Sequence, residues 1–226
     1  MKGSKRSRTA HSGSPKNRSI QAGRSWRPVR PFSLLIKPAG PDCNLRCRYC
    51  FYLPKLQLFG AQQPHRMSDA VLQQLVRSYL STRQPDYVFN WQGGEPTLMG
   101  LDFFERVIEL QRRYAPAGSR VTNTIQTNAT LIDADWAEFI ARNRILTGVS
   151  LDGPEEIHNI YRRDAADKGT FDQVMAGIEH LRSSGAEFNI LSMVTSSNTG
   201  RAKEIFDFFI RNKFHYQQYI PCVEFD

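Results

Sequence analysis

The sequence has no hydrophobic run that could cross a membrane and no set of cysteines that would form a disulfide framework. A helical membrane span needs about 20 consecutive apolar residues, and no stretch of the 226 residues approaches that length. Three of the four cysteines lie within eight positions, whereas disulfide-rich secreted domains distribute paired cysteines along the chain. We therefore expect the chain to reside in the reducing cytoplasm.

Acidic residues are missing from the first thirty positions, which hold nine of the 30 Lys and Arg residues. The rest of the chain carries 21 basic and 22 acidic residues, so the basic charge belongs to this tail. Its composition predicts disorder over residues 1–30, and it lacks the apolar core of a secretory signal. A solvated extension is the simpler interpretation, and an arm for nucleic acid or an anionic surface is the alternative. The folded body is expected to bind neither nucleic acid nor a membrane.

Beyond the tail, apolar runs alternate with amphipathic segments. This order predicts an α/β fold with a parallel sheet and right-handed crossovers, in which helices cover strands that are apolar on both sides. We expect a partial (βα)6 barrel over residues 31–226, with Asp133 as a helix N-cap and a capping box from Thr170 to Gln173. The expected strands are 32–37, 87–91, 121–127, 145–151, 187–194 and 214–220, and the expected helices are 68–80, 101–114, 133–142, 170–183 and 201–211.

Chemically distinctive residues follow the ends of four consecutive expected strands. Because the carboxyl ends of parallel strands share one rim, where barrel enzymes hold their active sites, these residues are expected to converge. In chain order they are the cysteines, Gly93-Gly94-Glu95-Pro96, Gln126-Thr127-Asn128 and Ser150-Leu151-Asp152-Gly153.

The cysteines Cys43, Cys47 and Cys50 form a CxxxCxxC motif. A structural zinc ion takes four protein ligands, whereas three thiolates on a 4Fe–4S cluster leave one iron open for a ligand that is not protein. We favour the open cluster. Zinc with a distant fourth ligand such as Cys222, or plain structural thiols, are the alternatives. The five histidines show no metal-site spacing.

The glycines at 93 and 94 allow a tight turn and a close approach to a ligand, whose polar groups could meet free backbone amides. A plain strand-to-helix turn is the commoner meaning of such a pair. The residue after Asn128 is Ala129 and not Gly, which weakens any claim that the backbone there must be left-handed.

A hydroxyl at Ser150 and a guanidinium at Arg162 suit a carboxylate ligand, because the planar fork of Arg matches carboxylate geometry. Arg163 is the alternative to Arg162. Asp152 precedes Gly and Pro, a pattern more typical of a turn than of a catalyst, and His158 is interpreted as structural.

Taken together, these motifs resemble the radical S-adenosylmethionine superfamily, through CxxxCxxC after the first strand, the aromatic Phe51 behind it, and the GGEP element after the second strand. More narrowly, several stretches resemble the anaerobic sulfatase-maturating enzymes. The likeness runs from about residue 32 to the C-terminus and is carried by residues 33–39, 43–52, 92–97, 150–154 and 187–195.

The resemblance implies two cofactors, a 4Fe–4S cluster held by the three cysteines and S-adenosyl-L-methionine. It implies that Gly93 and Gly94 contact the amino group of the methionine moiety, with Glu95 either accepting from that ammonium or bracing the loop. Ser150 and Arg162 match the residues that hold the methionine carboxylate.

The resemblance also places Tyr52 and Gln92 at the target residue of the substrate, with ordinary packing as the alternative. The implied reaction oxidises a Cys or Ser side chain of a sulfatase polypeptide to formylglycine, by hydrogen abstraction with a 5′-deoxyadenosyl radical. An external donor such as flavodoxin or ferredoxin would supply electrons.

Relatives in this family carry a C-terminal cysteine-rich domain with auxiliary clusters, and nothing of that kind is present by residue 226. We therefore expect a truncated chain that is impaired in formylglycine formation. Another peptide-modifying radical enzyme, or a non-catalytic iron–sulfur or metal-binding module, are the alternative functions.

Overall fold

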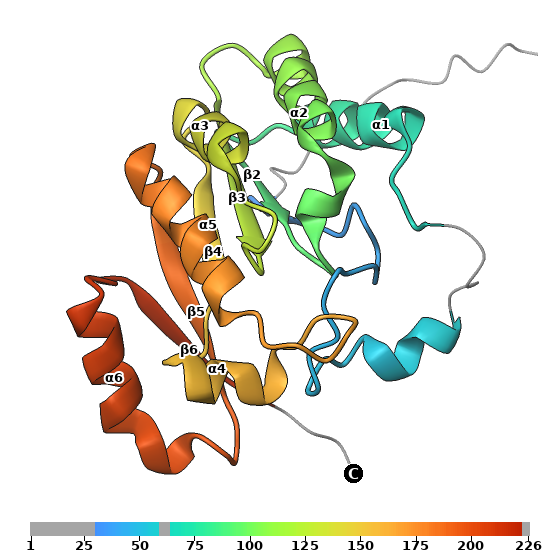
Figure 1. Cartoon of the computed structure of the whole chain (residues 1–226). Helices are drawn as coiled ribbons and strands as arrows, with labels where there is room; N and C mark the ends of the chain where they lie inside the picture. Colours follow the sequence, from blue (N-terminus) through green and yellow to red (C-terminus); the bar gives the residue numbers. More distant parts are fainter. Residues whose placement is uncertain (1–29, 59–63, 223–226) are drawn as a thin grey trace, which may run out of the picture.

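Six parallel strands form one sheet in the order β1 to β6, each paired with its neighbour in sequence (Figure 1). The computed structural model describes residues 30–58 and 64–222, so the predicted disorder of the tail lies outside the described residues, apart from Arg30. The strands are β1 (Leu34–Ile36), β2 (Asp86–Trp91), β3 (Arg120–Thr127), β4 (Leu146–Ser150), β5 (Phe188–Val194) and β6 (Gln217–Pro221).

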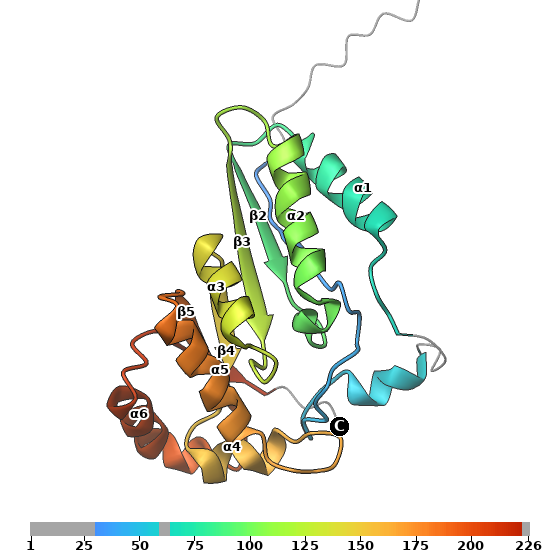
Figure 2. The same ribbon diagram turned by 45° about the horizontal axis from the view of Figure 1, so that its top comes forward.

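The helices cover one face of this sheet, as Figure 2 shows with the sheet behind them. Right-handed crossovers between neighbouring parallel strands put every connection on the same side, and the accumulated strand twist makes the other face concave. The predicted partial (βα)6 barrel is therefore confirmed. The helices are α1 (Asp69–Leu80), α2 (Leu101–Tyr114), α3 (Ala134–Arg142), α4 (Glu155–Tyr161), α5 (Phe171–Ser183) and α6 (Ala202–Arg211), with short 3₁₀ helices η1 (Leu53–Leu58), η2 (Pro96–Met99) and η3 (Thr199–Arg201).

The core lies between the sheet and these helices. Aromatic side chains of β2 alternate into it, and Trp91 packs edge-on against Phe104 of α2, with 5.6 Å between ring centroids. Tyr79 of α1 meets Phe89 in the same way at 5.0 Å. Burying one such side chain stabilises the fold by roughly 1.5–3 kcal/mol, so this aromatic cluster fixes the register of β2 against its helices.

The concave face differs from the prediction that strands are apolar on both sides. Along β2 the residues between the buried aromatics, including Asn90, are only half-buried, and β3 places Thr124 and Gln126 on the same face. Thr124 donates to Asn90 Oδ1 at 2.9 Å. The prediction was wrong because it assumed a second covering layer, whereas this open sheet leaves its inner face accessible and polar.

Helix starts are set by side chains in two different ways. Asp133 accepts a hydrogen bond from Trp136 N at 2.9 Å, which confirms it as the N-cap of α3. Thr170 precedes α5 but makes no side-chain cap bond, so the capping box was a wrong prediction. Asn159 Oδ1 takes that role instead, accepting from Thr170 N (2.9 Å) and Phe171 N (3.1 Å).

Helix α4 is absent from the sequence prediction, which treated the stretch after β4 as a turn. It buries His158 completely, with Nε2 3.1 Å from Thr170 Oγ1. The structural interpretation of this histidine is thereby confirmed. Ala129, buried between β3 and α3, has φ of 59°, so the backbone there is left-handed although the residue is not Gly.

Within the described residues, none of the helices combines the length and apolar character that a membrane span requires.

Candidate functional site

The cysteines lie in a loop that leaves β1 through tight turns; residues 37–52 are called the cysteine loop here. Gly40 N donates to Lys37 O at 3.1 Å, and Cys50 N donates to Cys47 O at 2.8 Å. The second turn brings Cys47 and Cys50 close enough for their thiols to interact electrostatically. Local hydrogen bonds thus fix the backbone of the loop that holds the cysteines.

The segment between α4 and α5 holds the other side of the cysteine loop. Arg46 N donates to Arg163 O at 2.7 Å and Arg48 N donates to Tyr161 O at 2.9 Å. An exposed ion pair between Arg48 and Asp167 (3.0 Å) lies beside them. The loop is therefore anchored by backbone pairing to a segment more than a hundred residues away.

The three loop thiols are partly buried and lie close enough for their charges to interact. Burial raises the pKa of the Cys43 thiol to about 12 and also raises the pKa of the Cys47 thiol. Cys43 Sγ accepts from Leu45 N at 3.4 Å and from Asn128 Nδ2 at 3.7 Å. Burial therefore favours the protonated thiols of Cys43 and Cys47 until a cation stabilises the thiolates.

Within the described part of the chain, no three His, Cys, Asp or Glu side chains are arranged to hold a single metal ion. A tetrahedral zinc site would need its ligands to converge on one point. An iron–sulfur cluster instead takes its thiolates on different irons, at separate corners. The three thiols thus fit a multi-iron cluster better than one ion.

The GGEP element packs directly on the cysteine loop. Gly94 N donates to Gly40 O at 2.9 Å, and Glu95 N donates to Asp42 O at 2.8 Å. A Cβ on Gly94 would lie 2.0 Å from Asp42 O, and Gly93 has φ of 122°. These glycines therefore permit an approach to the chain's own backbone, and the amides of Gly94 and Glu95 are not free for a ligand as the sequence suggested.

Glu95 is buried and both its carboxylate oxygens are occupied. Oε1 accepts from Thr97 N (3.0 Å), Thr97 Oγ1 (2.7 Å) and Thr127 Oγ1 (2.7 Å), and Oε2 accepts from Asn128 N (2.7 Å). Burial raises the pKa of this carboxyl group, although the hydrogen bonds from Asn128 and Thr97 oppose the shift. The side chain joins the end of β2 to the end of β3, beside Cys43.

Ser150 is the last residue of β4 and is buried at the same rim. Arg162 follows α4 and is also buried, whereas the Arg163 side chain donates to the backbone of its own loop, from Nη1 to Asp167 O at 3.1 Å. Arg162 is close enough to the Cys47 thiol that its positive charge opposes the rise in the pKa of Cys47 that burial causes. Of the two arginines, the structure brings Arg162 to the cysteines.

Asp152 has buried partners in addition to the turn position that the sequence suggested. It is 2% exposed, and its carboxylate makes a two-pronged ion pair with Arg162, with both N–O distances 3.0 Å. The turn after β4 does exist, with Gly153 at φ of 146°. The sequence pattern identified the turn and missed the charge that the fold buries beside it.

The two residues expected near a substrate follow different strands, Tyr52 at the end of the cysteine loop after β1 and Gln92 directly after β2. Tyr52 stacks near Phe51 and lies under the ammonium group of Lys37, 5.1 Å from ring centroid to Nζ. Gln92 follows β2, and its backbone N donates to Ile36 O at 2.8 Å. Both side chains are partly exposed at the carboxyl ends of the strands.

Tyr49 and Asn44 were not assigned roles from the sequence, although both belong to the cysteine motif. Tyr49 is directed at Asp152, with 2.8 Å between the hydroxyl and Oδ2. Asn44 Oδ1 accepts from Asn128 Nδ2 at 2.9 Å. Their positions between the cysteines were the signal available, but the partners lie far along the chain.

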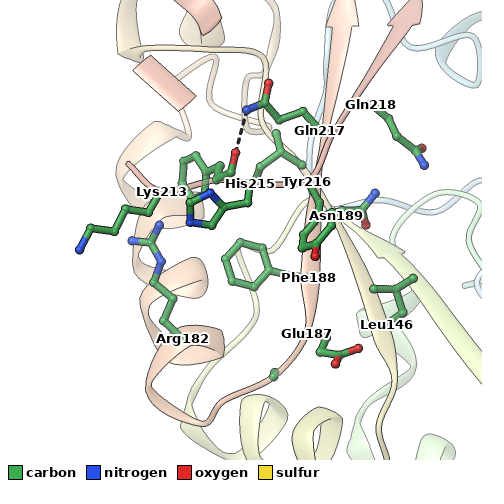
Figure 3. Close-up of a pocket in the computed structure, with 13 residues that line it drawn as sticks. Leu146, Arg182, Glu187, Phe188, Asn189, Lys213, His215, Tyr216, Gln217 and Gln218 are labelled. Atoms are coloured by element: carbon green, nitrogen blue, oxygen red, sulfur yellow. Dashed lines mark hydrogen bonds between the residues drawn. The ribbon is translucent and has the colours of Figure 1, made fainter. Parts of the chain in front are cut away.

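A cavity of about 820 Å³ lies at the opposite end of the sheet (Figure 3). Its lining includes Leu146, Phe188 and Gln217, the first residues of β4, β5 and β6. None of the predicted site residues lines it. Since parallel barrels carry out chemistry at the carboxyl ends of their strands, the rim with the cysteines is the stronger candidate.

Residues 38–209 match the model of the Radical SAM superfamily. The chain belongs to the radical SAM superfamily. Its members use a 4Fe–4S cluster and S-adenosyl-L-methionine (AdoMet), and the three cysteines, the GGEP element and the end of β4 all lie in the matched region.

Two similar proteins carry names that state the same type of activity. The chain is 41% identical over 194 residues to a cysteine-type anaerobic sulfatase-maturating enzyme of Clostridium perfringens, covering 86% of this chain and 52% of that protein. It is 39% identical over 197 residues to a serine-type enzyme of Bacteroides thetaiotaomicron, covering 87% and 47%. The chain thus spans about half the length of these curated relatives.

The structure resembles that of anSMEcpe with bound AdoMet and the Cp18Cys peptide, with a TM-score of 0.80 at 41% identity over 86% of this chain and 52% of that one. SuiB of Streptococcus suis, bound to S-adenosylmethionine, matches with a TM-score of 0.61 at 20% identity, covering 87% and 40%. The second likeness shows the fold alone.

Proposed function

We propose that this chain is the radical SAM part of an anaerobic sulfatase-maturating enzyme, which converts a Cys or Ser side chain of a sulfatase polypeptide to formylglycine. The observation that carries the proposal is the joining of the cysteine loop, the GGEP element and the end of β3 at one rim through Gly94, Glu95 and Asn128. Its similarity to both cysteine-type and serine-type enzymes leaves the choice of target open.

Cys43, Cys47 and Cys50 are the proposed ligands of the cluster. Their loop is held by backbone pairing on both sides, so little ordering is needed when the cluster binds. When bound, the cluster and S-adenosyl-L-methionine supply the electron transfer and the hydrogen abstraction of the reaction, and the protein supplies orientation and exclusion of water.

Backbone and side-chain groups at the same rim are proposed to orient S-adenosyl-L-methionine. An ammonium group needs acceptors, and the carbonyl oxygens of Gly93 and Gly94 accept no hydrogen bond from the described residues. We assign these carbonyls to the amine and Glu95 to bracing the loop, because its oxygens are already satisfied. Ser150 and Arg162 are assigned to the carboxylate, since a hydroxyl and a guanidinium both donate.

Tyr52 and Gln92 are proposed to position the target residue of the sulfatase peptide. The polar concave face between them and β4 offers amide and hydroxyl groups to a peptide backbone. A radical reaction needs the target hydrogen to be held close to the abstracting atom, which explains a set of fixed polar groups beside the cofactors. An external flavodoxin- or ferredoxin-type donor in the cytoplasm would supply electrons.

The proposal is tested by anaerobic reconstitution with iron and sulfide, followed by metal analysis and incubation with S-adenosyl-L-methionine. We expect about four irons and four sulfides per chain, and reductive cleavage of S-adenosyl-L-methionine. Cys47→Ala should lose the cluster, and Cys222→Ala, the matched control outside the loop, should keep it. One zinc per chain and no sulfide would support a metal-binding module instead.

A further inference from the structure

Four hydrogen-bond donors surround the carboxylate of Asp152. Oδ1 accepts from Arg162 Nη2 (3.0 Å) and Met193 N (3.0 Å), and Oδ2 accepts from Arg162 Nε (3.0 Å) and the Tyr49 hydroxyl (2.8 Å). Each oxygen therefore has two donors, in a site nearly closed to solvent. An amide in this position would have to direct its NH₂ group at two donors, so the site requires a carboxylate.

These contacts bring together parts of the chain that are far apart in sequence. Asp152 follows β4, Met193 lies in β5, Arg162 is the C-cap of α4, and Tyr49 lies between two of the cysteines. The guanidinium of Arg162 also lies over the Tyr49 ring, 5.4 Å from its centroid. One charge thus connects the cysteine loop to the ends of two strands.

The same contacts determine what Arg162 can still bind. Nε and Nη2 are used by Asp152, while Nη1 donates to no group among the described residues. A guanidinium gripped through two of its nitrogens has one orientation, so the remaining nitrogen is directed and not mobile. Its neighbour Cys47 is one of the proposed cluster ligands.

We propose that Asp152 is a positioning residue, which holds the guanidinium of Arg162 and the phenol of Tyr49 together. It thereby fixes the position of Arg162, the proposed ligand of the carboxylate, relative to the cysteine loop. This inference rests on the proposed function, because the ligand carboxylate is that of S-adenosyl-L-methionine. Asp152 itself touches neither cofactor; it acts through Arg162 and Tyr49.

The test uses the reconstituted full chain and its variants Asp152→Asn and Tyr49→Phe. Iron content and thermal melting report cluster loading and folding. Equilibrium dialysis measures the Kd for S-adenosyl-L-methionine, and electron paramagnetic resonance (EPR) of the reduced cluster measures the spectral change that this ligand causes. Asp167→Asn, which breaks the exposed ion pair with Arg48, is the matched control in the same pair of segments.

We expect Asp152→Asn to raise the Kd about tenfold or more, as loss of hydrogen bonds to a charged group does, and to alter the ligand-induced EPR change. Tyr49→Phe keeps the Asp152–Arg162 pair and should raise the Kd by a smaller factor with the cluster retained. Because both contacts pass through one carboxylate, the double variant should bind no more weakly than Asp152→Asn alone. Asp167→Asn should match the unmodified chain.

The inference is overturned if folded, iron-loaded Asp152→Asn binds S-adenosyl-L-methionine with an unchanged Kd and spectrum. Should Asp152→Asn fail to fold, Tyr49→Phe decides: an unchanged Kd and EPR response in that variant also overturns the inference. If the two substitutions raise the Kd independently, so that their effects add fully in the double variant, the two contacts do not act through one carboxylate. Failure of the unmodified chain to load a cluster or bind S-adenosyl-L-methionine would instead reject the proposed function.

Discussion

Each buried polar side chain at the rim forms hydrogen bonds with several partners at once. Glu95, which follows β2, accepts hydrogen bonds from Thr127 and Asn128 at the end of β3, and Asn128 in turn donates to Cys43 and Asn44. In a site shielded from water, each such bond is worth more than it would be at the surface, and an unmatched partner is costly. Single substitutions of these side chains should therefore measurably change the reduction potential of the cluster or the stability of the chain.

Asn128→Leu should lower the reduction potential of the reconstituted cluster. The hydrogen bond from Asn128 Nδ2 to Cys43 Sγ (3.7 Å) stabilises the more electron-rich reduced state. Loss of about 1 kcal/mol corresponds to about 40 mV for a one-electron couple. Spectroelectrochemical titration measures the shift, with Asn143→Leu, at the half-buried C-cap of α3 and outside the cysteine loop, as the control. An unchanged or higher potential would contradict this assignment.

His158 should make the stability of the cluster-free chain depend on pH. Burial, assisted by the nearby charge of Arg162, lowers the pKa of His158 to about 3, although Asp152 opposes the shift. The unfolded chain has a histidine pKa near 6.5, so between about pH 6.5 and 3 it binds a proton that the folded chain excludes. The contribution of neutral His158 to the free energy of unfolding is complete above about pH 6.5. It is lost as the pH falls, by up to about 1.4 kcal/mol per pH unit.

Urea unfolding of the cluster-free chain at pH 7.5, 6.0 and 5.0 measures this dependence. His158→Gln cannot gain a proton and should lose less stability than the unmodified chain over the same interval, even if it begins less stable. Parallel loss in the two proteins would show that other groups dominate the acid sensitivity.

Among the elements, the connections after the strands carry the site, and glycine decides how closely they pack. The GGEP turn lies on the cysteine loop with the chain backbones in contact. Helix α4 then returns the chain from β4 to the rim, where the segment after it pairs with the cysteine loop. Rigid strands thus hold three connections against one another.

Gly94→Ala should separate the GGEP turn from the cysteine loop. The added Cβ would lie 2.0 Å from Asp42 O, a backbone atom that cannot move without displacing Cys43. We expect a loss of stability of about 2–4 kcal/mol, comparable to other severe overpacking, and a large loss of iron uptake. Gly200→Ala, where a Cβ meets nothing within 4 Å, is the control and should change neither. Normal iron loading in Gly94→Ala would contradict the proposed packing.

At the scale of the whole molecule, the sheet is open and the chain spans about half the length of its curated relatives. The concave face is polar and partly exposed. Closed barrels and covered sheets exclude water from their interiors, and radical chemistry depends on that exclusion. The described residues therefore provide the rim proposed for the cofactors without enclosing it.

The reconstituted chain alone should cleave S-adenosyl-L-methionine but form little formylglycine. Without a full enclosure the target hydrogen is poorly held, and small misplacements cost about 100-fold or more in rate. Mass spectrometry of a Cys- and a Ser-containing sulfatase peptide, beside 5′-deoxyadenosine quantification, measures both products. The full-length enzyme of Clostridium perfringens is the positive control, and formylglycine at its rate would refute the expectation.

Several features of this protein follow from the sequence alone. The order of the six strands and of every α-helix except α4, the convergence of the cysteines with GGEP, and the N-cap at Asp133 depend on residues that are neighbours in the chain or on the common direction of parallel strands. Local periodicity and capping reflect short-range sterics and hydrogen bonding, so a single sequence contains the information needed to predict them.

Only the tertiary structure decided which polar groups meet. Asp152 follows the sequence pattern of a turn, yet it binds Tyr49 from 103 positions away and Arg162 from ten. Thr170 has the sequence of a capping residue, but Asn159 caps α5 in its place. The partners of a buried charge are chosen by how the folded layers bring distant segments together, and burial makes those pairings obligatory because an unpaired charge there costs several kcal/mol.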